Sequence, residues 1–306
     1  MSAVIYGQAV ESDLERHRVE LRGYCYRMLG SAFDADDAVQ ETLLRAWRGL
    51  DGFEGRASLR SWLYRIATNV CVDMARGNRR RAHPADLTGN GEDAVEPVPD
   101  RLVVPDGDPA DQVAARETIK LAFVAALQHL PPRQRAVLIL REVLRWSANE
   151  VAELLGLTPA AVNSALQRAR ATLAAVDPVR TDPLPQPKNA LLMRYVDAFE
   201  RFDLDALTAL LDLDATLAIS PYVSWLQGRD EIRNWWDGPG SGCRGSMLCR
   251  LTANGAPAFG QYRPGGNPWA LQVLDISAGR IIGINTFLDT ERLFPLFELP
   301  ARAPAA

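Results

Sequence analysis

Amide, hydroxyl and guanidinium side chains gather on one side of a predicted helix near the middle of the chain. Asn163, Ser164, Gln167, Arg168 and Arg170 alternate with the apolar residues of the same stretch. Side-chain amides can read the edges of base pairs, and guanidinium groups can bind guanine or a phosphate. The chemistry that this set favours is therefore contact with the major groove of DNA.

The surrounding sequence predicts the element that carries this face. Ser147 followed by Glu150 predicts a capping box for a short helix that Gly156 ends. Thr158 then caps the next helix, with Pro159 at its first position. A short helix, a glycine turn and a capped helix indicate a helix-turn-helix, although an ordinary helical hairpin with a solvated polar face has the same pattern.

A second polar stripe lies nearer the N-terminus, on a helix predicted to start near Ser58. It combines basic and amide side chains, runs beside aromatic residues and ends in three consecutive arginines; its members are Arg65, Asn69, Asp73, Arg76, Arg79, Arg80 and Arg81, with Phe53, Trp62 and Tyr64 beside them. Such a mixture suits a nucleic-acid strand whose phosphates are neutralised and whose bases stack. The alternative is a core tryptophan beside a solvated basic helix end.

The helix before it has an acidic face. Asp37, Gln40 and Glu41 are predicted to be exposed, while residues 39, 43, 47 and 50 form its apolar side. The carboxylates could bind a partner protein, or they could only stabilise the start of the helix.

Composition and charge set limits on the class of protein. The 306 residues, of which 47% are hydrophobic and 24% charged, indicate a globular protein of two or three domains. No apolar run is long enough for a membrane span, and Met1 to Glu11 do not resemble a signal peptide. Cys243 and Cys249 are spaced too widely for a zinc knuckle, so we expect no metal, no cofactor and a reducing cytoplasm.

Changes in composition predict the domain boundaries. A helical module over residues 12–80 precedes a Pro-, Gly- and acid-rich stretch, 81–112, which we interpret as a flexible linker of net charge −6. A second helical module, 113–176, has net charge +4, so the overall −4 does not exclude nucleic acid. A proline-rich tether over 177–187 leads to a third module, 188–297.

The third module differs in its pattern. Helical periodicity up to residue 211 is followed by strand-like segments at 247–251, 258–262, 269–276 and 280–287, separated by Gly, Pro and Asn turns. We expect an α+β domain in which helices cover a curved antiparallel sheet.

Family resemblance adds to these interpretations. Residues 37–47 (DAVQETLLRAW) and 53–69 (FEGRASLRSWLYRIATN) resemble region 2 of the group 4, or extracytoplasmic-function (ECF), sigma factors of bacterial RNA polymerase. Residues 130–135 (LPPRQR) and 148–173 are similar to region 4 of the same family. The fold that this implies is multidomain, with two all-α sigma modules and the α+β domain.

The resemblance implies a role for each matched residue. Asp37, Gln40 and Glu41 match the face that binds the β′ clamp helices of core RNA polymerase, whose β flap is a further partner. Residues matching the part that melts the −10 element are Phe53, Arg56, Ser58, Trp62, Arg65, Asn69, Arg76, Arg79 and Arg80. Residues matching the helix that reads the −35 element are Pro159, Ala160, Asn163, Ser164, Gln167, Arg168 and Arg170. Arg56 stands where the family often has Asp, which affects the preferred −10 base.

The third module resembles the SnoaL-like branch of the NTF2-like superfamily, through residues 228–232 and 279–287. Such cones often enclose a pocket, here with Tyr222, Trp225, Trp235 and Trp236 as candidate lining residues. The acidic candidates for catalysis, Asp214, Asp230 and Asp275, also fit turns or caps, so we expect no catalytic residue. The resemblance implies a sigma factor regulated in cis by this domain, without a separate anti-sigma protein. The alternative is a DNA-binding regulator fused to a cyclase- or isomerase-type enzyme or a ligand-sensing domain.

Overall fold

The computed structural model describes residues 13–53, 55, 57–81, 95–175, 188–221 and 224–303. The chain divides into two compact units. The helical unit comprises Met1–Ala85 and Asp100–Pro178, and the sheet unit comprises Asp86–Pro99 and Val179–Ala306. The chain therefore enters the sheet unit twice, first through the segment that ends at Pro99 and again after Pro178.

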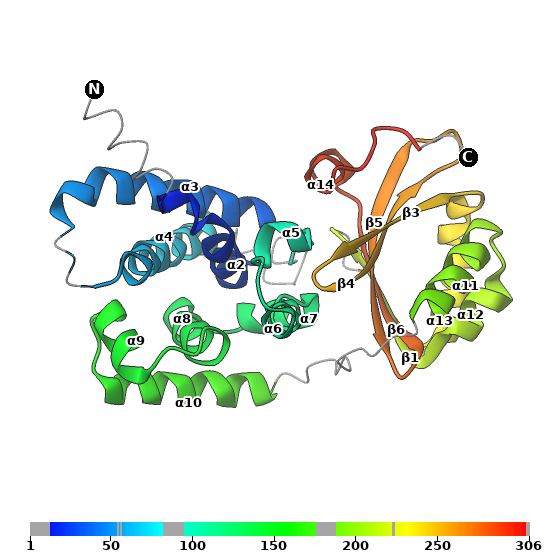
Figure 1. Cartoon of the computed structure of the whole chain (residues 1–306). Helices are drawn as coiled ribbons and strands as arrows, with labels where there is room; N and C mark the ends of the chain where they lie inside the picture. The colour runs from blue at the N-terminus through cyan, green and yellow to red at the C-terminus, as the bar shows by residue number, and fades with distance from the viewer. Residues whose placement is uncertain are drawn as a thin grey trace, which may run out of the picture. The chain divides into compact units, whose positions relative to one another are not determined.

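The helical unit begins with α2 (Arg18–Leu29), α3 (Ala32–Gly49) and α4 (Leu59–Arg81) (Figure 1). Gly30 ends α2 in the left-handed conformation, with φ of 77°, and the Ser31 hydroxyl accepts the Asp34 N–H at 3.1 Å to start α3. This pair of caps reverses the chain within two residues. Leu21 of α2, Val39 of α3 and Leu63 of α4 are fully buried and belong to the core that the three helices share.

The apolar side of α3 differs from the predicted one. Val39 and Leu43 are buried as expected, but Trp47 is 61% exposed and Ala46 is buried instead. Each residue of an α-helix advances about 100°, so two successive i+4 steps lead about 80° away from the starting direction. Trp47 has thus rotated off the buried stripe, whereas Ala46 is only about 20° from Val39.

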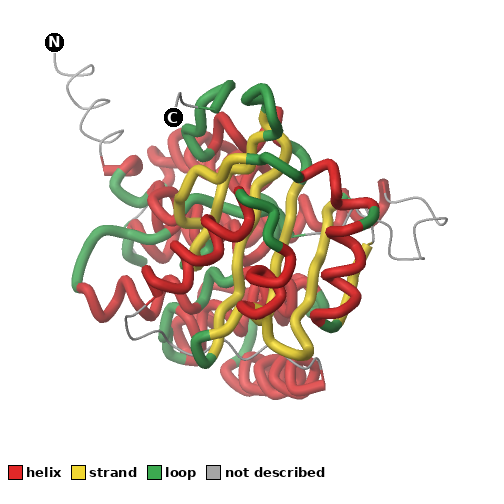
Figure 2. Tube along the Cα trace, turned by 90° about the vertical axis from the view of Figure 1, so that its right-hand side faces the viewer, coloured by secondary structure: helices red, strands yellow, loops and turns green. Residues whose placement is uncertain are grey.

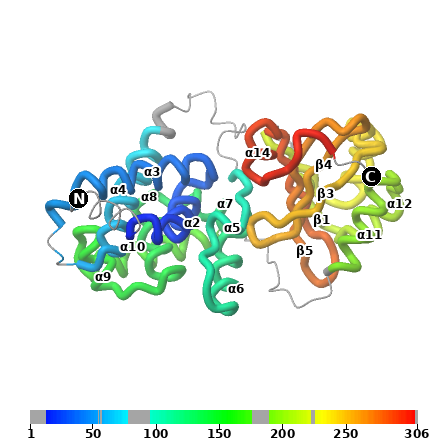
Figure 3. Tube along the Cα trace, turned by 45° about the horizontal axis from the view of Figure 1, so that its top comes forward, coloured from blue at the N-terminus to red at the C-terminus, as the bar shows by residue number. Residues whose placement is uncertain are grey.

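The helical unit continues with α5 (Asp100–Val103), α6 (Pro109–Glu117), α7 (Leu121–Gln128), α8 (Pro132–Leu138), α9 (Ala148–Leu155) and α10 (Pro159–Ala175). Part of the predicted linker, 81–112, is therefore helical. Helices α5 and α7 lie beside α2 (Figure 3). Val103 of α5 is buried, and a Cβ at Gly23 of α2 would lie only 2.6 Å from its carbonyl oxygen. Composition predicted a linker here because the stretch is rich in acidic residues and proline. It also contains a short apolar run, and that run packs against α2.

Two kinds of helical turn follow one another over residues 132–143. Helix α8 starts at Pro132, and a π-helical turn, Ile139–Val143, follows it directly. Both Ile139 and Leu140 are buried, so the wider turn still delivers apolar side chains to the core.

Two buried arginines join α2 to the second half of the helical unit. Arg27 of α2 donates to the Thr118 hydroxyl at 2.7 Å and to the Thr118 carbonyl at 3.1 Å. Arg135 of α8 donates to the Gln128 and Leu130 carbonyls at 2.9 and 3.1 Å, and also to the Met28 carbonyl at the end of α2. Burial lowers the pKa of Arg27 to about 10, which still leaves the guanidinium charged at neutral pH.

The sheet unit contains α11 (Lys188–Glu200), α12 (Leu204–Leu210), α13 (Arg229–Asp237) and α14 (Thr290–Leu296). Its strands are β1 (Leu211–Ser220), β2 (Ser224–Gln227), β3 (Met247–Ala253), β4 (Ala256–Tyr262), β5 (Pro268–Ser277) and β6 (Arg280–Phe287). Within the described residues they form one six-stranded sheet of order β2-β1-β6-β5-β4-β3. Helices α11, α12 and α13 lie together over one face of this sheet (Figure 1, Figure 2). This is the α+β architecture expected for an NTF2-like cone.

The sheet is mixed, although we expected an antiparallel one. Strands β3 to β6 form an antiparallel meander, and β1 pairs antiparallel with β2, but β1 and β6 are parallel. The cause is the connection through α13, which takes the chain from β2 to the opposite edge of the sheet. The meander then returns and places its last strand beside β1.

A short segment that precedes Asp100 belongs to the sheet unit. We call residues 95–99 the docked segment, because Val98 is 1% exposed and its N–H donates to the Asn254 side-chain oxygen at 2.9 Å. The Asn254 N–H donates in turn to the Val98 carbonyl at 3.1 Å. Arg292 of α14 forms an ion pair with Glu96 at 3.2 Å. The part of the predicted linker that the structure describes before Asp100, residues 95–99, thus belongs to the sheet unit.

Candidate nucleic-acid interface and a cavity in the sheet unit

The helix-turn-helix geometry follows from three caps. Ser147 and Glu150 form the predicted capping box, at 3.2 and 2.7 Å, and these hydrogen bonds lower the pKa of Glu150. Gly156 takes the left-handed conformation at φ of 64° and ends α9. The Thr158 hydroxyl then accepts the Ala161 N–H at 3.2 Å and starts α10. The predicted caps of both helices are therefore confirmed.

Helix α10 is two-sided. Its apolar residues Val162, Ala165, Leu166 and Ala169 are buried. The residues predicted to face DNA are all exposed: Pro159, Ala160, Asn163, Ser164, Gln167, Arg168 and Arg170. Arg170 forms an ion pair with Glu142 at 2.5 Å, and both side chains are largely exposed, so water and salt weaken this pair. The polar face thus has the exposure that a major-groove contact needs.

The candidate −10 face lies on α4 and the turn before it. Arg65, Asn69 and Arg76 are exposed along one side of the helix. Trp62 is half-buried, and its ring stacks on that of Phe53 with centroids 4.9 Å apart. The Ser58 hydroxyl accepts the Ser61 N–H at 3.1 Å, so it caps the helix as well. Arg56 lies outside the described residues, as do the side chains of Arg79 and Arg80.

The candidate polymerase face lies on α3. Asp37 and Gln40 are exposed, and Glu41, half-buried, pairs with Arg45 at 2.6 Å. Leu44 and Trp47, at 40% and 61% exposure, continue the same side of the helix. Sequence reasoning missed these two as surface residues. A helical wheel would have found them, since positions 37, 40, 41, 44 and 47 fall within one half-turn.

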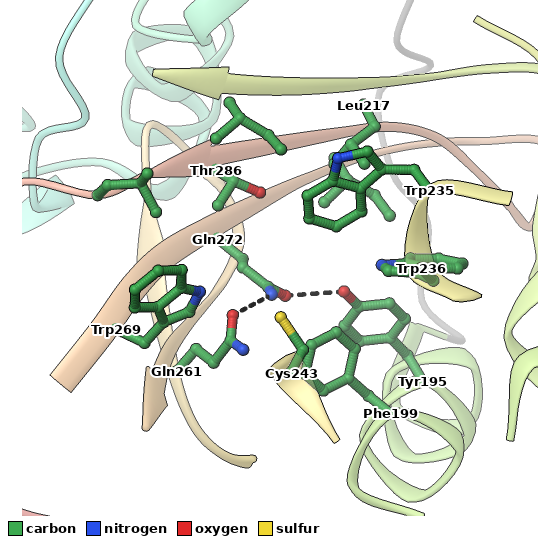
Figure 4. A pocket seen from close by; sticks show the side chains of 13 residues that line it. Tyr195, Phe199, Leu217, Trp235, Trp236, Cys243, Gln261, Trp269, Gln272 and Thr286 are labelled. Carbon is green, nitrogen blue, oxygen red and sulfur yellow. Dashed lines mark hydrogen bonds between the residues drawn. The ribbon is translucent and has the colours of Figure 1, made fainter. Parts of the chain in front are cut away.

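The sheet unit holds a cavity of about 240 Å³ between the helices and the inner face of the sheet (Figure 4). Its lining residues are Tyr195, Phe199, Leu217, Ile219, Trp235, Trp236, Cys243, Gln261, Trp269, Gln272, Ile284, Thr286 and Leu288. Of the predicted lining residues, Trp235 and Trp236 lie at the cavity. Trp225 does not: it is 62% exposed on the short strand β2. Tyr222 lies outside the described residues.

Sequence reasoning missed the polar lining. Gln261 and Gln272 are buried on β4 and β5, among apolar neighbours. A glutamine inside an otherwise apolar strand was the available signal, because a buried amide needs partners. None of the acids considered for catalysis reaches the cavity. Asp214 and Asp230 are exposed, and Asp275 accepts a hydrogen bond from Asn285 at 2.8 Å.

A capped helix-turn-helix, a second helical module with a polar and basic face, and an appended α+β domain define a DNA-binding transcription protein. Family models agree: "Sigma-70 region 2" matches residues 14–81 and "Sigma-70, region 4" matches residues 120–173. The chain is 45% identical over 307 residues to the ECF RNA polymerase sigma factor SigG of Mycobacterium tuberculosis, an alignment covering 94% of this chain and 82% of SigG.

Two further proteins resemble the chain over most of its length. The probable ECF RNA polymerase sigma factor SigI of M. tuberculosis is 25% identical over 289 residues, covering 92% of this chain and 93% of SigI. The crystal structure of the M. tuberculosis ECF sigma factor SigJ matches the fold with a TM-score of 0.64 at 23% identity, covering 96% of this chain and 99% of that one.

The chain belongs to the family of ECF RNA polymerase sigma factors. Its function is to direct promoter-specific initiation of transcription. In the part of the chain that the structure describes, no helix is both long and apolar enough to span a membrane.

Proposed function

We propose that three exposed faces of the helical unit act in transcription initiation. One reads the −35 element, one melts the −10 element and one binds core RNA polymerase. The polar face of α10 reads the −35 element through Asn163, Gln167 and Arg168, while Pro159, Ala160, Ser164 and Arg170 fit it against the backbone. The observation that carries this assignment is the two-sided α10, with an apolar side that is buried and a polar side that is exposed. Side-chain amides and guanidinium groups have the geometry to bind base edges and phosphates.

The −10 element is melted at α4. A base that leaves the duplex loses stacking worth a few kcal/mol, and a pocket with an aromatic surface and hydrogen bonds offsets that loss. The stacked pair Phe53 and Trp62 offers such a surface, and Arg65 and Asn69 offer donors beside it. Arg76, Arg79 and Arg80 hold the non-template strand, while Arg56 and Ser58 belong to the loop that takes part in melting.

Core RNA polymerase binds the face that Asp37, Gln40 and Glu41 form on α3, through the β′ clamp helices, and the β flap receives region 4. Charged residues at an exposed face give orientation and association rate, and an apolar centre gives affinity. Trp47 and Leu44 supply that centre. Since its partners are the polymerase and promoter DNA, the protein acts in the cytoplasm.

The sheet unit regulates this activity in cis. The docked segment, 95–99, lies in the connection between the two sigma modules, and the sheet unit buries Val98 and pairs with Glu96. Holding that connection restricts how far the modules can separate on a promoter. Regulation by an attached domain makes a separate anti-sigma protein unnecessary. We favour regulation over catalysis for this unit, because the lining residues that the structure describes include no carboxylate or imidazole to act as acid or base.

The test is transcription in vitro with core polymerase and three chains: the full chain, one ending at Val176 and one ending at Ala301. All three should direct initiation at one start site, and the chain without the sheet unit should give a different yield. Arg168→Ala should lower transcription from the cognate promoter but not from one with a scrambled −35 element. Equal yields from both promoters with both proteins would remove α10 from −35 recognition. Equal core affinity and yield from all three chains would remove the regulatory role.

A further inference from the structure

The cavity of the sheet unit is large enough for an organic ligand. Its volume of about 240 Å³ exceeds the roughly 150 Å³ of an apolar protein cavity that accepts benzene. It is close to the lower end of the ligand pockets found in proteins, roughly 300 Å³. A molecule of about two fused rings fits this space.

The lining selects against charge. Among the described residues that line the cavity there is no Asp, Glu, Lys, Arg or His. Two lining groups could ionise, the Tyr195 hydroxyl and the Cys243 thiol, and burial raises the pKa of both, so they are neutral at pH 7. An ammonium ion placed here would lose its hydration without gaining a counter-ion. A carboxylate would find a cation only behind the wall, where the Arg263 guanidinium stacks on the Trp269 ring.

Aromatic rings form much of the wall (Figure 4). Trp235 and Trp236 come from α13, Trp269 from β5, and Tyr195 and Phe199 from α11. The Tyr195 and Phe199 rings lie 5.8 Å apart between centroids. Flat faces from three separate elements favour a planar ligand, because ring contacts are strongest in offset-stacked and edge-to-face arrangements.

One side of the cavity carries a directed hydrogen-bond relay. Tyr195 O–H donates to the Gln272 side-chain oxygen at 2.8 Å, and Gln272 Nε2 donates to the Gln261 side-chain oxygen at 2.8 Å. Gln261 Nε2 then donates to the Ser246 hydroxyl at 3.1 Å. An amide nitrogen has two hydrogens, and the relay uses only one of those on Gln272. The other is suited to a carbonyl oxygen of a ligand in the cavity.

We infer that the cavity is a receptor site for a neutral, planar aromatic compound of about two fused rings that carries a carbonyl group. The ligand binds without chemical change, since the Tyr195 hydroxyl already donates to Gln272 and the described lining has no carboxylate or imidazole to take a proton. This site is separate from the faces that bind DNA and polymerase, so its test succeeds or fails independently of promoter recognition.

The experiment is titration of the full chain with three probes of similar shape, followed by calorimetry and by quenching of tryptophan fluorescence. Acetylnaphthalene is neutral and has a carbonyl, naphthoate is an anion, and isopropylnaphthalene has no acceptor. Acetylnaphthalene should bind one site with a Kd on the order of 100 µM, the range reached by ligands of this size. Naphthoate should bind at least about 100-fold more weakly, and isopropylnaphthalene about 5-fold more weakly.

Variants locate the site. Ile219→Phe fills the cavity and Gln272→Leu removes the relay amide while keeping its shape, so each should weaken acetylnaphthalene binding by about tenfold or more. Gln227→Leu is the matched control, because Gln227 is exposed on β2 and does not line the cavity. The inference is overturned if acetylnaphthalene does not saturate a site, if naphthoate binds equally well, or if folded Ile219→Phe binds as the wild type does. Should Gln272→Leu fail to fold, the probe series and Ile219→Phe decide.

Discussion

Removal of the Asn254 side chain should weaken the attachment of the docked segment to the sheet unit. Asn254→Gly deletes the acceptor that the Val98 N–H uses at 2.9 Å. The backbone of residue 254 has φ of 55°, a conformation that glycine adopts without strain, so the turn between β3 and β4 should keep its shape. The substitution therefore acts on the contact with Val98 and not on the fold of the sheet.

The size of the effect follows from burial. Val98 is 1% exposed, so its N–H would be left without a partner while docked. A buried donor without an acceptor costs about 1–3 kcal/mol, which corresponds to a factor of about 5 to 150 in the equilibrium between docked and released segment. Val98 should then spend measurably more time in water.

Amide hydrogen exchange, followed by mass spectrometry on the full chain, measures this equilibrium directly. Pro97 and Pro99 have no N–H, so two peptides that share one start and end at residues 96 and 99 differ only by the deuterium of the Val98 amide. Its exchange in Asn254→Gly should be about 5 to 150 times faster than in the wild type. Ala278→Gly is the matched control, since Ala278 is exposed, has φ of 46° and lies in the turn between β5 and β6. The reasoning is refuted if Val98 exchanges equally fast in the wild type and in Asn254→Gly.

Three further outcomes are expected. Asp37→Arg combined with Glu41→Arg should abolish co-purification with core polymerase while leaving thermal unfolding unchanged, and normal co-purification would limit these acids to helix capping. Trp47→Ala should weaken core binding by about 1–3 kcal/mol in a titration against core enzyme, with little loss of stability because the side chain is exposed; an unchanged Kd would place the docking centre elsewhere. The capping hydrogen bonds of Glu150 lower its pKa in the folded protein. The ionised Glu150 therefore stabilises the fold at pH values above its pKa in the unfolded chain, and this stabilisation is lost as the pH falls through its lower pKa in the folded protein. Glu150→Gln, which keeps the capping box, should flatten that part of the acid-unfolding curve, and an identical curve would show that the capping carboxylate contributes nothing.

Local signals were sufficient for the helix-turn-helix and for most strands of the sheet unit. Each of the caps at Ser147, Gly156 and Thr158 depends on hydrogen bonds between residues at most four positions apart, so sequence spacing predicts them directly. The parallel pairing of β1 with β6 could not be predicted that way, since it depends on where the chain goes after α13. The same limit applies to the docked segment: nothing near Val98 in sequence indicates that Asn254 is its partner.

Burial explains the remaining differences. Trp47 is apolar and lies two i+4 steps after Val39, but each such step turns the side chain further from the buried side of α3. Which side of α3 is buried depends on the helices that pack against it. Gln261 and Gln272 are polar and are nevertheless buried, because Tyr195 and Ser246 satisfy them from other elements. The cavity could therefore not be outlined from the positions of its tryptophans alone.

The buried arginines Arg27 and Arg135 affect which distance between the −10 and −35 elements of a promoter the protein can bind. They join the helices that carry the proposed −10 face to those that carry the proposed −35 face, so we expect the distance between the two faces to change only when these hydrogen bonds break. The junction has a polar and an aromatic part, because the rings of Tyr64 and Trp146 also meet across it with centroids 5.2 Å apart. Water can satisfy the guanidinium groups and carbonyl oxygens once the two sides part, but it cannot replace the contact between the rings. Separating the two modules would therefore break these hydrogen bonds and also expose the buried rings of Tyr64 and Trp146 to water. When the −10 and −35 elements of a promoter lie at another distance than the joined modules favour, part of the binding free energy is used to separate the modules. We therefore expect the free energy of promoter binding to depend on the length of the spacer between the two elements.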